Sequence, residues 1–103
     1  MASRKKLFVV AIDQDAKTEQ RDEFTTWLRG QGAGFWHHIS HTWLVVDAKN
    51  VLTTAMLRDK ARVLMPEGTL IIMQVTPVEW NGFAPLASHA WLKKNLDDPE
   101  LHK

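Results

Sequence analysis

One stretch of fourteen residues, 34–47, constrains the fold of this chain more than any other. The segment GFWHHISHTWLVVD contains two tryptophans and three histidines, and it is too long for a single strand in a domain of 103 residues. It therefore predicts a β-hairpin. Ser40 and His41 mark the expected reversal, although neither is a residue type that hairpin turns favour.

Two nearly unbroken apolar runs, at 7–12 and 69–76, predict strands that are covered on both faces. Between these strands and the hairpin lie two segments with helical periodicity, at 18–29 and 51–65. Thr18 and Asn50 are the expected N-terminal caps. The inward-facing residues of the helices are expected to be Phe24, Trp27, Leu28, Leu57, Ala61 and Leu64.

The order strand, helix, two strands, helix, strand predicts an α+β fold of ferredoxin-like βαββαβ type. In this arrangement a four-stranded antiparallel sheet carries both main helices on one face. A short C-terminal helix, capped by Ser88 and reaching Leu96, follows the last strand. The chain is expected to form one domain over 1–103, with a core at about 7–76 and a C-terminal extension at 77–96.

The second face of the sheet also needs a cover, because the first and last strands are apolar at successive positions. Two helices hide only one face. Either the tail or a second copy of the chain must cover the rest, and we expect a homodimer.

Composition excludes several classes of function. The chain has no cysteine, which rules out disulfides, thiolate metal sites and cysteine nucleophiles. A net charge of +1 argues against coating nucleic acid by charge alone. No apolar run is long enough to cross a bilayer or serve as a signal sequence, so we expect a cytoplasmic protein without a membrane segment. Arg4, Lys5 and Lys6 form a short basic run, which is either a nucleic-acid or partner contact or a solvated flank.

Asp13 ends the first predicted strand and is the candidate metal ligand and catalytic residue. A carboxylate there suits Mg²⁺ or Mn²⁺, which take oxygen ligands. Two such aspartates at a dimer axis would hold one ion that activates water. The alternative is that Asp13 ends the strand and caps a turn by accepting nearby backbone amides.

Three histidines in the hairpin are further candidates for catalysis. Strand alternation places Phe35, His37 and Ile39 on one face and Trp36, His38 and Ser40 on the other. His37 and His38 therefore cannot bind one metal together. His41, at the turn, reaches either side, and an imidazole near Asp13 would serve as a general acid or base. The alternative is a packed, hydrogen-bonded structural role for each histidine.

The aromatic residues divide between the core and a candidate binding surface. Trp27 is expected in the core, and Trp43 is expected to pack within the sheet. Trp36, Trp80, Phe83 and Trp91 are candidates for a platform on which single-stranded nucleic acid stacks. They are also candidates for contacts with a protein partner or with the tail, because aromatic side chains are enriched at interfaces.

Several short motifs spread over most of the chain resemble one family. They are Ile12-Asp13, Trp36-His37-His38, Thr42-Trp43, Leu57-Arg58-Asp59-Lys60, Trp80-Asn81-Gly82-Phe83 and Trp91-Leu92. The pattern resembles the small bacterial and phage proteins often labelled SinR-family, distant relatives of the second CRISPR-associated protein, the small ferredoxin-like subunit of the spacer-acquisition complex.

The resemblance implies a fold more than an activity. The CRISPR relatives form homodimers through their sheets, and in some of them the aspartate that ends the first strand is implicated in metal-dependent nuclease activity. Only Asp13 matches that position, and this chain departs from the relatives in its Gln14-Asp15 and in lacking a marked basic surface. Two main hypotheses follow: a non-catalytic homodimeric adaptor or nucleic-acid-associated module, and a Mg²⁺- or Mn²⁺-dependent endonuclease with paired Asp13 carboxylates. A sensor of a small molecule or nucleotide, built on the histidine hairpin, is a third.

Overall fold

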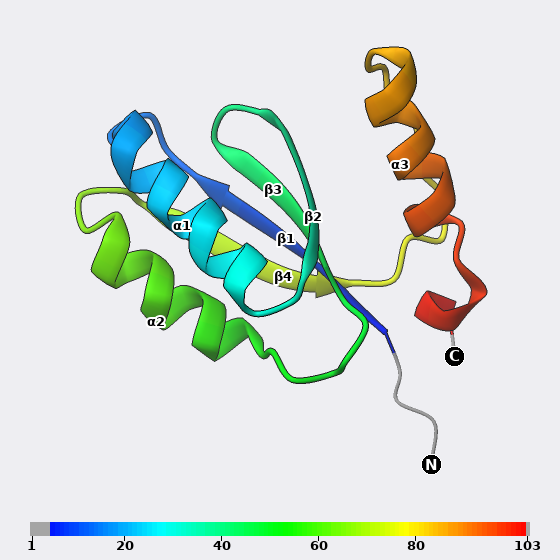
Figure 1. The fold of residues 1–103 in the computed structure, drawn as a ribbon, viewed down its shortest axis with the longest axis horizontal. Coiled ribbons are helices and arrows are strands. Elements are labelled where there is room, and N and C mark those ends of the chain that lie inside the picture. The colour runs from blue at the N-terminus through cyan, green and yellow to red at the C-terminus, as the bar shows by residue number, and fades with distance from the viewer. Residues whose placement is uncertain (1–4, 103) are drawn as a thin grey trace.

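The α+β fold predicted from the sequence is the fold of the protein. The structure is a computed structural model and describes residues 5–102. The sheet is antiparallel, with strand order β2-β3-β1-β4, and Figure 1 shows α1 and α2 together on one side of it and α3 on the other. In chain order the elements are β1 (Lys6–Ile12), α1 (Thr18–Gly30), β2 (Gly34–Ile39), β3 (Thr42–Asp47), α2 (Thr54–Leu64), β4 (Leu70–Val75), α3 (Leu86–Leu96) and the 3₁₀ turn η1 (Pro99–His102). This is the ferredoxin-like pattern with an added C-terminal helix.

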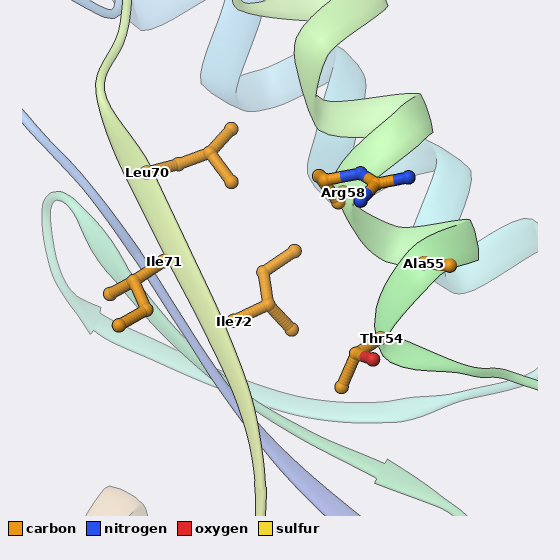
Figure 2. A pocket seen from close by; sticks show the side chains of 6 residues that line it. All are labelled: Thr54, Ala55, Arg58, Leu70, Ile71 and Ile72. Carbon is orange, nitrogen blue, oxygen red and sulfur yellow. The ribbon is translucent and has the colours of Figure 1, made fainter.

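Side chains alternate between the two faces along β4, the strand at one edge of the sheet. Leu70 and Ile72 point toward α2, whereas Ile71 points away from it (Figure 2). The first two pack against the core under the helices, while Ile71 stays 56% exposed. Within one chain, β4 is therefore covered on the face toward the helices and exposed at Ile71 on the other.

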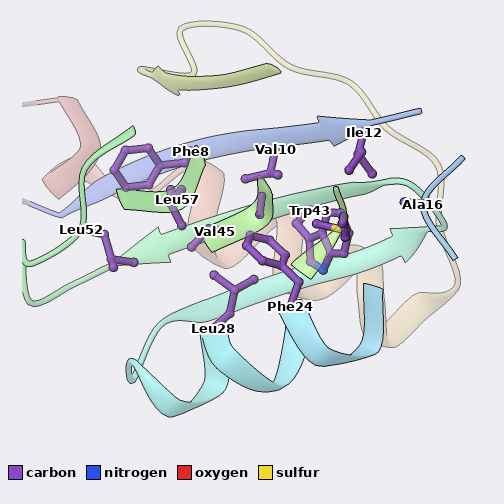
Figure 3. Packing of buried hydrophobic residues seen from close by; sticks show 12 residues of the cluster. Phe8, Val10, Ile12, Ala16, Phe24, Leu28, Trp43, Val45, Leu52 and Leu57 are labelled. Carbon is purple, nitrogen blue, oxygen red and sulfur yellow. The ribbon is translucent and has the colours of Figure 1, made fainter. Parts of the chain in front are cut away.

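The main core lies between the sheet and the helix pair (Figure 3). Trp43 is fully buried there, and its indole N–H donates to Thr25 Oγ1 at 2.9 Å. The ring of Phe24 meets the Trp43 ring edge-on at 5.0 Å. The strands contribute Phe8, Val10, Ile12, Trp43 and Val45, and the helices contribute Phe24, Leu28, Leu57 and Ala61. The prediction that the apolar stripes of both helices face the core is confirmed, although Trp27 and Leu64 are only partly buried at its margin.

A second core covers part of the opposite face. Leu92 and Leu96 of α3 and Leu101 of η1 pack on Leu7, Trp36 and Val46. The tail thus covers the face over β2, β3 and the start of β1. Ile71 of β4 points to this face, as does Met73 by strand alternation, and both remain exposed. No helix within residues 5–102 combines the length and apolar character needed to cross a membrane.

The helix starts differ from the prediction in three places. Lys17, not Thr18, is the N-cap of α1, and its N–H donates to Gln20 Oε1 at 2.9 Å. Thr53 caps α2 by accepting from Met56 N, while Asn50 lies in the preceding loop with a φ of 57°. Ser88 is buried inside α3 rather than at its cap, which is Pro85.

The late start of α2 has a clear physical reason. Leu52 is fully buried, and its N–H donates to the buried carboxylate of Asp47 at 2.6 Å. Lys6 Nζ donates to the Leu52 carbonyl at 2.9 Å. These two hydrogen bonds, one local and one from β1, hold the chain around Leu52 in a loop conformation, and the helix begins only where Thr53 supplies a cap.

Candidate functional site

Asp13 lies where β1 ends, as predicted, and its carboxylate is held by the backbone. One oxygen accepts the Thr69 N–H at 3.0 Å, and the other accepts the Asp15 N–H at 3.1 Å. These two amides, Thr69 first, hold the pKa of Asp13 below its ordinary value of 3.8. The arrangement joins the end of β1 to the start of β4, which is the turn-capping role.

His41 lies near Asp13, and its ring is held by a cation. Its Nε2 lies 3.0 Å from Arg21 Nη1. A guanidinium only donates hydrogen bonds, so Nε2 accepts and carries no proton in this contact. Arg21 is fixed in turn by the Ala16 carbonyl at 2.6 Å. His41 therefore braces α1 against the hairpin turn, and the general-base role expected of it would require this contact to break.

The other two hairpin histidines lie apart, as the alternation predicts. His37 Nδ1 donates to the Thr42 carbonyl at 2.9 Å, and its ring stacks on Trp43 at 4.2 Å with 6° between the planes. His38 is exposed, and its ring centroid lies 5.2 Å from that of Trp36. Within residues 5–102, no three histidine or carboxylate side chains gather as a metal site.

The two described lysines of the basic run at the N-terminus bind to distant parts of the chain. Lys5 Nζ forms an ion pair with Asp98 at 2.6 Å, which joins β1 to the segment before η1. Lys6 Nζ is bonded to the Leu52 carbonyl. Arg4 lies outside the described residues. Both described lysines therefore hold parts of the fold together.

The structure brings three of the predicted binding residues together. Trp36, Trp80 and Phe83 line one pocket of about 220 Å³ between β2, β3, α3 and the loop before α3. The other lining residues are Ile39, Thr42, Leu44, Asn81, Gly82, Leu92 and Leu96. None of these described lining residues carries a charge. We call this cavity the aromatic pocket.

Hydrogen bonds to the C-terminal region fix the two indoles of the aromatic pocket. The N–H of Trp36 donates to the Ser88 carbonyl of α3 at 3.0 Å. The N–H of Trp80 donates to Asp97 Oδ1, just after α3, at 2.8 Å. Phe83 differs, because its side chain is fully exposed at the rim. The pocket thus has rigid walls and one free aromatic ring beside its mouth.

A β-bulge places Ile39 in this pocket, against the prediction. Trp36 pairs with Leu44 and Ile39 pairs with Thr42, so β2 has one extra residue over this stretch. The extra residue reverses the alternation, and Ile39 shares a pocket with Trp36 instead of a face with His37. No sequence signal marked the bulge. The tail, which packs Leu92 and Leu96 on the sheet here, was one of the two covers expected for this face.

The comparisons with known proteins find no match, whether to family models, to curated proteins or to solved structures.

Proposed function

We propose that this protein is a non-catalytic adaptor that binds a partner protein by taking one large apolar side chain into the aromatic pocket. The observation that carries the proposal is the convergence of Trp36, Trp80 and Phe83 on one uncharged cavity. The pocket of about 220 Å³ is smaller than the roughly 300–1,000 Å³ typical of small-molecule sites. A single buried anchor residue is the kind of contact that dominates protein interfaces.

A role in stacking nucleic acid has less support. Trp36 is only 7% exposed, so it offers no open ring face to a base. Sites for single strands pair stacking rings with a basic groove, and no lysine or arginine is among the described residues that line the pocket. Both features favour an apolar side chain as the occupant.

The metal-dependent endonuclease also has less support, because both carboxylate oxygens of Asp13 already accept backbone amides. We expect no cleavage of single- or double-stranded RNA or DNA with Mg²⁺ or Mn²⁺. Cleavage that disappears in Asp13→Ala would refute the non-catalytic proposal. Cleavage that survives in Asp13→Ala would indicate contamination or a different site.

The proposed function fits the resemblance to the small SinR-family proteins. The ferredoxin-like relatives in that resemblance act as subunits of an assembly. A homodimeric adaptor of this kind would need a surface for a partner and a separate surface for its second copy. The aromatic pocket is our candidate for the first.

The test is a selection of displayed peptides on the wild-type protein, followed by affinity measurement by titration calorimetry. We expect the selected peptides to share one large apolar anchor residue. Ile39→Glu places a charge at the rim, at a side chain that is 56% exposed, and should weaken binding at least tenfold. Replacing the anchor of the peptide with alanine should have the same effect.

Val63→Glu is the matched control, since Val63 is 72% exposed on α2 and does not line the aromatic pocket. Its affinity for the peptides should equal that of the wild type. Peptides without a shared apolar anchor, or peptides that bind Ile39→Glu as well as wild type, would overturn the proposal.

A further inference from the structure

The outer side of β4 is an unprotected strand edge. β4 is the last strand of the sheet and pairs only with β1 among the described strands. Its sequence, LIIMQV, contains no charge and no proline, the devices that usually protect an edge from pairing with another chain. At the other edge, β2 has a bulge and packs against α3.

Two backbone hydrogen bonds establish which amides of β4 point outward. Asp13 N donates to Thr69 O at 2.9 Å, and Ile12 N donates to His41 O at 2.9 Å, toward the hairpin. Successive residues of β1 therefore bond alternately to β4 and β3. The backbone N–H and C=O groups of Thr69, just before β4, and of every second residue after it point toward β1. The N–H and C=O groups that face outward belong to Leu70, Ile72 and Gln74.

We infer that this edge pairs antiparallel with β4 of a second copy of the chain, about a two-fold axis at Ile72. Ile72 then lies opposite Ile72, and Leu70 lies opposite Gln74 of the second copy. Every outward N–H meets an outward C=O in this register, and the two four-stranded sheets become one continuous sheet. The three outward residues are centred on Ile72, which makes the strand complementary to itself.

The same register pairs the two exposed apolar side chains of β4. Ile71 is 56% exposed and Met73 is 47% exposed. With the axis at Ile72, Ile71 of each copy lies opposite Met73 of the other. Cross-strand apolar pairs of this kind stabilise antiparallel sheets, and both side chains would leave water. The same register thus pairs the outward backbone N–H and C=O groups and covers the exposed side chains of Ile71 and Met73.

On the helix face, an open groove lies between α2 and β4 (Figure 2). It measures about 280 Å³ and is lined by Thr54, Ala55 and Arg58 of α2 and by the first residues of β4. Arg58 pairs with Asp59 at 2.9 Å, so its charge is balanced within its own helix. The helix-face side chains of the second β4, which carry no charge, would enter this groove.

A pair of double variants tests the register. In Ile71→Glu/Met73→Glu, like charges oppose each other at both cross-strand pairs. In Ile71→Lys/Met73→Glu, each lysine opposes a glutamate of the other copy. Sedimentation equilibrium should give the mass of a dimer for the wild type and for the Lys/Glu variant. The double-glutamate variant should give the mass of a single chain.

Both positions are exposed, so the variants should fold, and circular dichroism checks this. Val63→Glu, at a more exposed apolar side chain on α2, should keep the wild-type mass. Amide hydrogen exchange reads the edge directly: the N–H groups of Leu70 and Ile72 should lose protection in the double-glutamate variant, whereas that of Met73, which faces β1, should keep it.

Three results would overturn the inference. They are a wild-type protein that sediments as a single chain up to millimolar concentration, a double-glutamate variant that keeps the wild-type mass, and a Lys/Glu variant that fails to recover it. Protection of Leu70 and Ile72 that appears only when an extended peptide is added would assign the edge to a peptide instead. The edge lies apart from the aromatic pocket, so the peptide-binding test and this test give separate answers.

Discussion

At the end of β1, one side chain connects two distant parts of the chain. Asp13 accepts the N–H of Thr69, which lies just before β4, and the N–H of Asp15 in the following turn. The carboxylate form is the better acceptor of these bonds, which lowers the pKa of Asp13 in the folded protein. The same bonds that occupy the candidate metal ligand thus make the stability of the fold depend on pH.

Asp13→Asn should therefore lower the free energy of unfolding at neutral pH, and it should lower it by less in acid. The folded-state pKa lies below the ordinary value of 3.8, so the wild type gains stability above that value and loses it as the pH falls through the folded-state pKa. Urea unfolding at pH 7 and pH 3 measures the difference. Asp15→Asn, at an exposed side chain two residues away, is the control and should show little effect at either pH.

At the scale of elements, α3 both covers the sheet and builds the aromatic pocket. Leu92 and Leu96 pack in the second core and also line the pocket. Trp36 is anchored by the carbonyl of Ser88 on the same helix. The helix thus couples the stability of this face to the shape of the candidate site.

Leu92→Ala should destabilise the protein by about 2–5 kcal/mol, because it removes a nearly buried side chain from a packed core. Leu86→Ala makes the same change on the same helix at a side chain that is 89% exposed, and should cost less than about 0.5 kcal/mol. Thermal and urea unfolding of both variants measure the contrast. Equal effects would mean that α3 does not pack on the sheet.

The sequence predicted the elements better than it predicted their contacts. Apolar periodicity and the length of 34–47 were enough to predict the succession of strands and helices along the chain, since this depends on local pattern and segment length. The start of α2 depended on the hydrogen bonds around Leu52, and one of these comes from Lys6, which is distant in sequence. The aromatic residues of the site were identified by type, but their convergence required the placement of α3 and of the loop before it, and the position of Ile39 beside them required the β2 bulge.

On the scale of the whole molecule, the sheet separates two surfaces with different chemistry. The aromatic pocket lies over β2 and β3, and the open edge belongs to β4, with β1 between them. The pocket offers a rigid cavity for one side chain, whereas the edge offers backbone groups in a self-complementary register. A dimer formed at the edge would carry two pockets at the far sides of one sheet, each free to bind.

Binding at the pocket and pairing at the edge should therefore be independent. The double-glutamate variant at Ile71 and Met73 should bind the selected peptides with a Kd within about twofold of the wild type, because sites without shared contacts contribute additively. Calorimetry at a concentration where the wild type is a dimer gives the comparison, with one peptide bound per chain in both proteins. A tenfold weaker Kd in the variant, or one peptide per two chains in the wild type, would mean that the second copy contributes to the pocket.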